Sequence, residues 1–151
     1  QLAPFADLFY WADSRFYRWF KSEIDDFVGE KVTGSHDGDY PADVRRVRWD
    51  RTSPFSADPD QVAGQCSGAH ALNLVALLGC TEIWLLGYDF DAGWWHDGYP
   101  MDSRPEFREK KFVPAIEAMG PHLAASGIAV FNANPASKLR CFPFRDLAEA
   151  L

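Results

Sequence analysis

The chain has 151 residues, a formal net charge of −7 and 47% hydrophobic residues, which fits one ordinary domain with a core of its own. This acidity argues against a nonspecific nucleic-acid binder, which needs clustered Lys and Arg to displace counterions from phosphates. The longest apolar stretch, over 71–78, is too short to span a bilayer and the first residues lack a signal-peptide pattern, so we expect no membrane partner and a cytoplasmic location.

The predicted elements alternate between strands and helices along the chain. An aromatic strand over 7–12 is followed by an amphipathic helix that begins at Ser14 and is ended by Gly29. In chain order the pattern then predicts a strand over 31–33, an edge strand over 44–49, a long loop over 51–64, a helix over 67–78, a buried strand over 82–86, a long loop over 91–105, a helical region over 106–125 with a break near 120, a strand over 128–131 and a short helix over 145–151.

This alternation predicts the fold class. We expect an α/β chain, a single three-layer Rossmann-like domain over 1–151, with a mainly parallel sheet and helices on both faces. Ligands of such folds bind beyond the carboxyl ends of the strands. The residues that follow predicted strands are therefore the first candidates for a ligand site: Asp13, the loop before Ser67, 89–96 and 132–137.

The turn over 64–68, Gly-Gln-Cys-Ser-Gly, precedes the helix over 67–78. The free N–H groups of a first helical turn and the helix dipole favour an anion, so Ser67 and Gly68 are predicted to contact a phosphate. The alternative is an ordinary Ser cap with glycines that serve the turn. The motif is neither GxGxxG nor a P-loop.

Two further patterns have both a chemical and a structural interpretation. Cys66 and His70, four apart on one helix, suit a nucleophile–base pair or half of a metal site, or else a buried thiol and a structural histidine; no third ligand has a recognisable spacing. The three cysteines of the chain fit free thiols. The basic residues over 45–48, with Arg51, suit a phosphate-facing patch or a solvated strand face.

The chemistry-bearing residues after the later strands are Asp89, His96, Asn132, Asn134 and Ser137. Asp89 is predicted to bind a ribose hydroxyl, to hold Mg²⁺ or to act as a base, and its alternative role is to cap the following loop. His96 is the best general acid or base. Asn132 and Asn134 suit a base or sugar, although Asn-Pro and Ser137 are also ordinary turn and cap residues.

Several segments together resemble known families. The motif over 65–68, the helix to Gly79, the segment Glu-Ile-Trp-Leu-Leu-Gly-Tyr-Asp-Phe over 82–90 and Asn-Pro-Ala-Ser-Lys-Leu over 134–139 resemble the core of the Rossmann-like bacterial sialyltransferases. The same core is similar to the MptE-like 6-hydroxymethylpterin diphosphokinases and to uncharacterised phage and prophage proteins. The phage group also has the Ala-Asp-x-x-Tyr-x-x-Asp-x-x-Phe start that is found here over 6–16.

The resemblance implies a nucleotide-binding transferase, with glycosyl transfer from a nucleotide-sugar as the expected reaction. Diphosphoryl transfer and a noncatalytic phage accessory domain are the alternatives. Two departures affect this expectation. The first strand and Gly-x-Gly-Pro-Ser-type loop of these families have no counterpart here, so we expect a fold that lacks them, either because the sequence is N-terminally incomplete or because the site is degraded. Asp91 stands where the sialyltransferases have a tyrosine that supports the leaving group.

Overall fold

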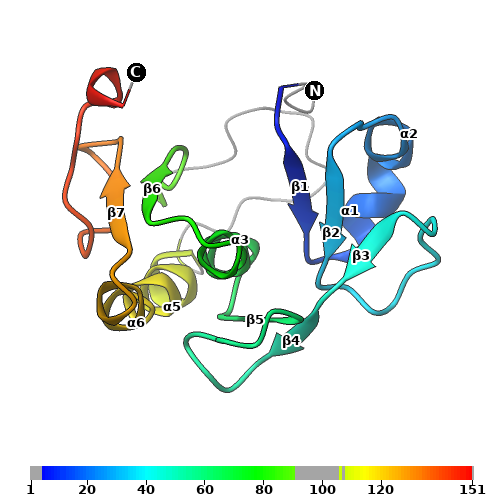
Figure 1. The fold of residues 1–151 in the computed structure, drawn as a ribbon, viewed down its shortest axis with the longest axis horizontal. Coiled ribbons are helices and arrows are strands. Elements are labelled where there is room, and N and C mark those ends of the chain that lie inside the picture. Colours follow the sequence, from blue (N-terminus) through cyan, green and yellow to red (C-terminus); the bar gives the residue numbers. More distant parts are fainter. Residues whose placement is uncertain (1–4, 91–105, 107, 151) are drawn as a thin grey trace. The chain divides into compact units, whose positions relative to one another are not determined.

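The computed structural model describes residues 5–90, 106 and 108–150 (Figure 1). They form a mixed α/β structure of short strands and helices that divides into two compact units, Gln1–Leu74 and Val75–Leu151. Every strand pair in these residues is parallel, as the alternation of elements predicts. Among the described residues, each helix is too short or too polar to cross a lipid bilayer.

The first unit contains a three-stranded parallel sheet in the order β1-β2-β3. Strand β1 is Leu8–Trp11, β2 is Glu30–Thr33 and β3 is Val44–Arg46, so β3 lies at an edge as predicted (Figure 1). Between β1 and β2, two short helices, α1 (Ser14–Trp19) and α2 (Lys21–Asp25), replace the single predicted helix. The helical spacing predicts a buried stripe of Phe16, Trp19, Phe20, Ile24 and Phe27. Ile24 and Phe27 are buried, but Trp19 is exposed and Tyr17 is buried instead.

A second parallel pair in this unit joins β4 (Arg48–Asp50) to β5 (Gln61–Ala63). The predicted strand over 44–49 is thus two strands, separated at Val47, whose N–H donates to the Thr33 carbonyl at 2.9 Å. The prediction of an uninterrupted loop over 51–64 is wrong at β5. Val47 and Val62 are fully buried in one cluster with Val32 and Leu74, so core packing explains both strands.

Helix α3 (Ser67–Leu77) follows β5 and ends one residue before its predicted end. Gly79 has a φ of +87°, and the N–H groups of Gly79 and Cys80 donate to the carbonyls of Ala76 and Val75. This left-handed glycine closes the helix because a residue without Cβ adopts positive φ without strain.

The second unit contains one parallel pair, β6 (Glu82–Leu85) and β7 (Ala129–Asn132). The helical region between them consists of the π-helical turn η1 (Arg108–Phe112), α5 (Val113–Glu117) and α6 (Gly120–Ala125), and so restarts at Gly120 as the sequence predicts. Ile116, Met119 and Leu123 form the buried side. The predicted C-terminal helix is a single 3₁₀ turn, η2 (Leu147–Glu149).

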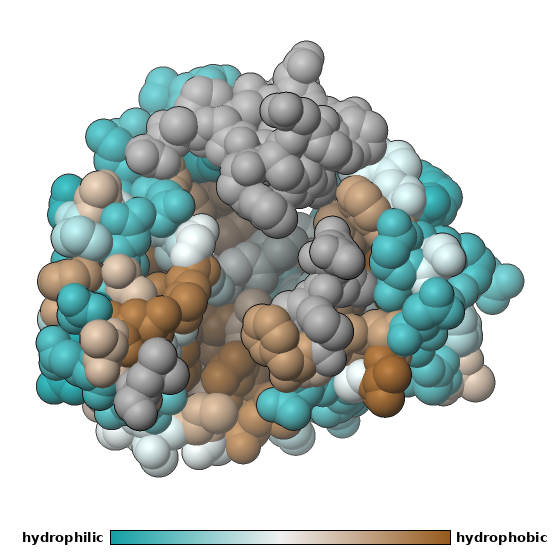
Figure 2. Space-filling view, turned by 90° about the horizontal axis from the view of Figure 1, so that it is seen from above, coloured by the Kyte–Doolittle hydropathy of each residue, from teal (hydrophilic) through white to brown (hydrophobic). Residues whose placement is uncertain are grey.

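The surface mixes hydrophobic with hydrophilic residues, as the space-filling view shows (Figure 2). Val28 and Leu86 are among the exposed large hydrophobic side chains. Leu86 was expected to be covered as the end of a buried strand, but it lies one residue beyond β6 and is 58% exposed.

Candidate functional site

Four of the predicted site residues lie together in the second unit, at the carboxyl ends of β6 and β7. The Asn134 Nδ2 donates to Oδ1 of Asp89, and the Asn134 backbone N–H donates to the Asn132 Oδ1 at 3.0 Å. The Asp89 carbonyl accepts from the N–H of Lys138 at 2.8 Å. The polar cluster, defined as Asp89, Asn132, Asn134 and Ser137, is therefore one hydrogen-bonded arrangement.

Asn132 and Ser137 are the buried members of the polar cluster. The Ser137 hydroxyl donates to the Tyr88 carbonyl and accepts from the Leu139 N–H at 3.0 Å. The second Asn132 contact, Nδ2 to the Leu139 carbonyl, is 3.4 Å long. Because buried polar groups must be paired, these two side chains hold the segment after β7 in place. Their hydrogen bonds support the turn and cap interpretation for Asn132 and Ser137.

Asp89 and Asn134 are the half-buried members of the polar cluster. Only Oδ1 of Asp89 has a hydrogen-bond partner among the residues that the structure describes. Asn134 accepts from the Ala136 N–H at 2.8 Å through Oδ1 and uses one of its two Nδ2 protons on Asp89. A carboxylate oxygen and an amide proton thus remain for a ligand on the half-buried face of the cluster.

The turn over 64–68 lies in the first unit and is fixed by the carbonyl of Gly64. This oxygen accepts from Nε1 of Trp49 at 2.8 Å and from Nε2 of His70 at 3.1 Å. Gly64 has a φ of +107°, and a Cβ placed on it would lie 2.5 Å from the Cβ of Ala69. Glycine is therefore required here both by the backbone conformation and by the close approach of the helix.

His70 is a structural histidine rather than a free base. Since the Gly64 carbonyl only accepts, Nε2 carries the ring proton, and Nδ1 accepts from the Tyr10 hydroxyl at 2.8 Å. The ring is 1% exposed, and burial lowers the pKa of His70 from 6.5 to about 4. Burial raises the pKa of the Tyr10 hydroxyl, because there too it disfavours the charged form. Both nitrogens of the imidazole are occupied, which leaves no lone pair for a metal.

Cys66, and not Ser67, receives hydrogen bonds from the first turn of α3. Its sulfur accepts from the Ala69 N–H at 3.4 Å, and burial raises the pKa of the thiol. Ser67 is exposed and Gly68 is half-buried. A weakly accepting thiol at this position is easily displaced, so the phosphate interpretation of Ser67 and Gly68 stays a prediction.

Asp13 caps α1. Its carboxylate accepts from the Arg15 backbone N–H at 2.8 Å and forms an ion pair with the Arg15 guanidinium. The Arg15 side chain holds the pKa of Asp13 below its usual value. This capping role accounts for the position of Asp13 after β1 without the need for a ligand.

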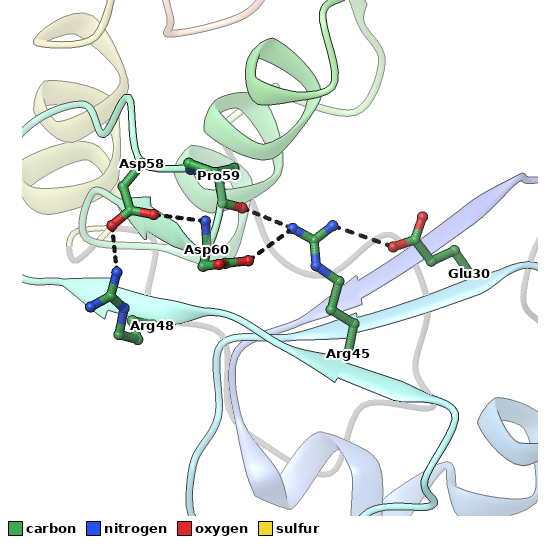
Figure 3. Close-up of polar contacts among 6 residues, drawn as sticks. All are labelled: Glu30, Arg45, Arg48, Asp58, Pro59 and Asp60. Atoms are coloured by element: carbon green, nitrogen blue, oxygen red, sulfur yellow. Dashed lines mark hydrogen bonds and ion pairs between the residues drawn. The ribbon is translucent and has the colours of Figure 1, made fainter.

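Two of the basic residues over 45–48, Arg45 and Arg48, face acidic partners (Figure 3), whereas Arg46 donates to the Gly38 carbonyl. Arg45 lies between Glu30, at 3.5 Å, and Asp60, at 3.6 Å, and donates to the Pro59 carbonyl at 2.8 Å. Arg48 pairs with Asp58, whose other oxygen accepts from the Asp60 N–H (Figure 3). These partners balance the arginines and tie the segment over 58–60 to the strands, which favours the strand-face interpretation over a phosphate patch.

An apolar hollow of about 590 Å³ lies between α6, β7 and residues 141–143 in the second unit. None of the polar cluster lines it, and its walls are mostly aliphatic or aromatic side chains such as Leu123, Val130 and Phe142. Its chemistry does not suit a nucleotide phosphate. Among the described residues, no group of three His, Cys, Asp or Glu side chains is arranged to hold a metal ion.

His96 lies outside the described residues. Sequence reasoning missed the roles of Asn73 and Trp49. Asn73 is fully buried, accepts from the N–H groups of Ser56 and Ala63, and donates to the Ser56 carbonyl at 2.9 Å. The signal was present, because an amide that interrupts an apolar helix face must find polar partners when it is buried.

Comparison of the chain with family models, with curated proteins and with solved structures gives no match in any of the three.

Proposed function

We propose that this chain is a nucleotide-binding, transferase-like domain with a three-layer Rossmann-like fold, and that the polar cluster contacts its ligand. The observation that carries this proposal is the half-buried Asp89–Asn134 pair at the carboxyl ends of two adjacent parallel strands. Ligands of parallel α/β sheets bind at that end of the strands. Among the described residues, one carboxylate oxygen of Asp89 and one amide proton of Asn134 are without a partner there, whereas Asn132 and Ser137 are satisfied internally.

The reaction that we propose is glycosyl transfer from a nucleotide-sugar to an acceptor hydroxyl. His96 would take the acceptor proton as the new glycosidic bond forms, and the nucleotide would leave with the electrons of the broken bond. The phosphate contact predicted for Ser67 and Gly68, with or without Mg²⁺, stays a separate proposal for the first unit. Diphosphoryl transfer is the alternative enzyme, and the resemblance to the sialyltransferases and to the diphosphokinases supports both.

A noncatalytic accessory domain is the second candidate, in keeping with the resemblance to phage and prophage proteins. One observation favours it. The thiol of Cys66 accepts from the first turn of α3, where a phosphate would bind. A fold that has lost its ligand is expected to pair the N–H groups of the former binding site with its own side chains.

A thermal-shift panel with CMP, CTP, ATP and GTP, each with and without Mg²⁺, tests the proposal. A ligand that binds the folded state at 100 times its Kd stabilises it by about 2.7 kcal/mol, which shifts the melting temperature by several degrees. The panel is run on the wild type, on Asp89→Asn and on Glu149→Gln. Glu149 is an exposed carboxylate of the same unit, so its substitution makes the same chemical change away from the polar cluster.

We expect a shift with at least one nucleotide that is smaller in Asp89→Asn than in the wild type and is kept in Glu149→Gln. Asparagine at 89 keeps an oxygen for the Asn134 amide, so the variant loses charge but not the hydrogen bond. The absence of a shift with every nucleotide would remove the enzyme interpretation and leave the accessory domain. An equal shift in both variants would place the nucleotide away from Asp89.

A further inference from the structure

The orientation of the Asn134 amide is fixed by two different neighbours. The Ala136 N–H needs an acceptor and lies 2.8 Å from Oδ1, while the Asp89 carboxylate needs a donor and contacts Nδ2. Exchange of the amide oxygen and nitrogen would set donor against donor and acceptor against acceptor. One Nδ2 proton therefore points to Asp89 and the other is left without a partner among the described residues.

The position of Asp89 is fixed as firmly, through its backbone. Its carbonyl accepts from the Lys138 N–H at 2.8 Å, and the preceding carbonyl, that of Tyr88, accepts from the Ser137 hydroxyl. Ser137 is 1% exposed, so this anchor is shielded from water. The next residue, Phe90, has a φ of +58°, an uncommon conformation for a bulky side chain. These contacts anchor the backbone at Asp89, and the Asn134 amide holds its carboxylate.

The two groups without a partner among the described residues form an adjacent acceptor and donor. Oδ2 of Asp89 can accept a strong, charge-assisted hydrogen bond, and the free Nδ2 proton of Asn134 can donate one. A phosphate does not suit this pair, since the carboxylate repels it. A pair of neighbouring hydroxyl groups does, because one hydroxyl can donate to the carboxylate while the other accepts from the amide.

We propose that Asp89 and Asn134 form a recognition pair for the vicinal diol of a ribose. This inference rests on the proposed function and names the part of the nucleotide that the polar cluster contacts. Specificity follows from the chemistry, since a ligand without these hydroxyls leaves the carboxylate and the amide unpaired on binding. The chain would then prefer ribonucleotides to their deoxy analogues.

Isothermal titration with three matched nucleotides tests the diol pair on the wild-type chain. The probes are CTP, 2′-deoxy-CTP and 2′,3′-dideoxy-CTP, with the corresponding ATP series in parallel, so that the result does not depend on the base. We expect the Kd of the dideoxy nucleotide to be at least tenfold higher than that of the ribonucleotide, with the 2′-deoxy form between them.

Two variants, Asp89→Asn and Asn134→Ser, test whether the discrimination arises at this pair, and Glu149→Gln is their control. In Asp89→Asn the ratio of the two Kd values should fall below about threefold, because a neutral amide oxygen accepts more weakly than a carboxylate. Glu149→Gln should keep the wild-type ratio. Asn134→Ser keeps an oxygen for the Ala136 N–H but removes the free amide proton, and should lower the ratio as well.

The outcomes separate the diol pair from the proposed function. Ribonucleotide and dideoxynucleotide Kd values that agree within twofold on the wild type would overturn the diol pair and leave nucleotide binding intact. Discrimination that persists unchanged in Asp89→Asn would overturn it too. Failure of every nucleotide to bind would overturn both.

Discussion

The buried imidazole of His70 makes the stability of the chain depend on pH. Burial holds the pKa of the folded-state ring at about 4, whereas the unfolded chain has the ordinary value of 6.5. Between these two values the unfolded state binds a proton that the folded state does not, so stability is lost as the pH falls from about 6.5 to about 4. Below that range both states are protonated and this residue causes no further loss.

The size of the effect follows from the same two values. At about 1.4 kcal/mol per pKa unit, their difference corresponds to about 3 kcal/mol at full protonation. At pH 5, where the unfolded state is mostly protonated and the folded state is not, linkage gives a loss of about 2 kcal/mol relative to pH 7.5. Proton uptake at Nδ1 would also remove the acceptor for the Tyr10 hydroxyl.

Urea unfolding at pH 7.5 and pH 5 measures this loss. Carboxylates titrate in the same range, so the quantity of interest is the difference between the wild type and His70→Gln, in which glutamine can still donate to the Gly64 carbonyl. His36→Gln, at an exposed position, is the matched control and should keep the wild-type dependence. An equal loss of free energy in the wild type and His70→Gln would refute the reasoning, as would an NMR pKa near 6.5 for this ring.

Five substitutions at four positions test the rest of the structure by the free energy of unfolding. Gly64→Ala and Gly79→Ala should each lose roughly 1–3 kcal/mol, because both sites have positive φ. Gly64→Ala should lose more, because only its Cβ meets Ala69. Equal losses would contradict the close approach at Gly64. Asn73→Ala should cost about 3 kcal/mol or more, since it leaves buried N–H groups unpaired, and a loss below 1 kcal/mol would mean that water replaces the amide. Cys66→Ser should be at least as stable as the wild type, while Cys66→Ala should lose about 1 kcal/mol; the reverse order would contradict the cap at the start of α3.

Much of the fold could be predicted because its signals are local. The apolar and aromatic runs that become β1 and β6 are bounded by polar or turn residues, and their predicted ends lie within one residue of the observed ones. Helix α3 begins at Ser67 as predicted and ends within one residue of its predicted end. Its end could be predicted because Gly79 is a backbone signal that needs no tertiary contact.

The elements that were missed depend on partners distant in sequence. Strand β5 is three residues long and exists because it pairs with β4 and because the Asn73 amide accepts from the Ala63 N–H. The break between α1 and α2 was missed, and the core takes up Tyr17, which lay outside the predicted stripe, together with Ile24, which belonged to it. No local pattern contains this information.

The candidate site divides in the same way. That Asp89, Asn134 and Ser137 would lie together followed from one rule, that the carboxyl ends of adjacent parallel strands share an edge. The contacts around the turn over 64–68 could not be predicted, because the Gly64 carbonyl and the His70 ring pair with Trp49 and Tyr10, which are remote in sequence.

Nucleotide binding at Asp89 and Asn134 is tested most directly by ¹⁵N NMR of the side-chain amides during titration with the best nucleotide of the panel. The Asn134 Nδ2 protons and the Lys138 backbone N–H should shift in proportion to saturation, because the first would donate to the ribose and the second is bonded to Asp89. At equal nucleotide concentration the same signals should shift less in Asp89→Asn. Saturation of the wild type with the Asn134 signals unmoved would contradict the assignment of the polar cluster as the nucleotide site.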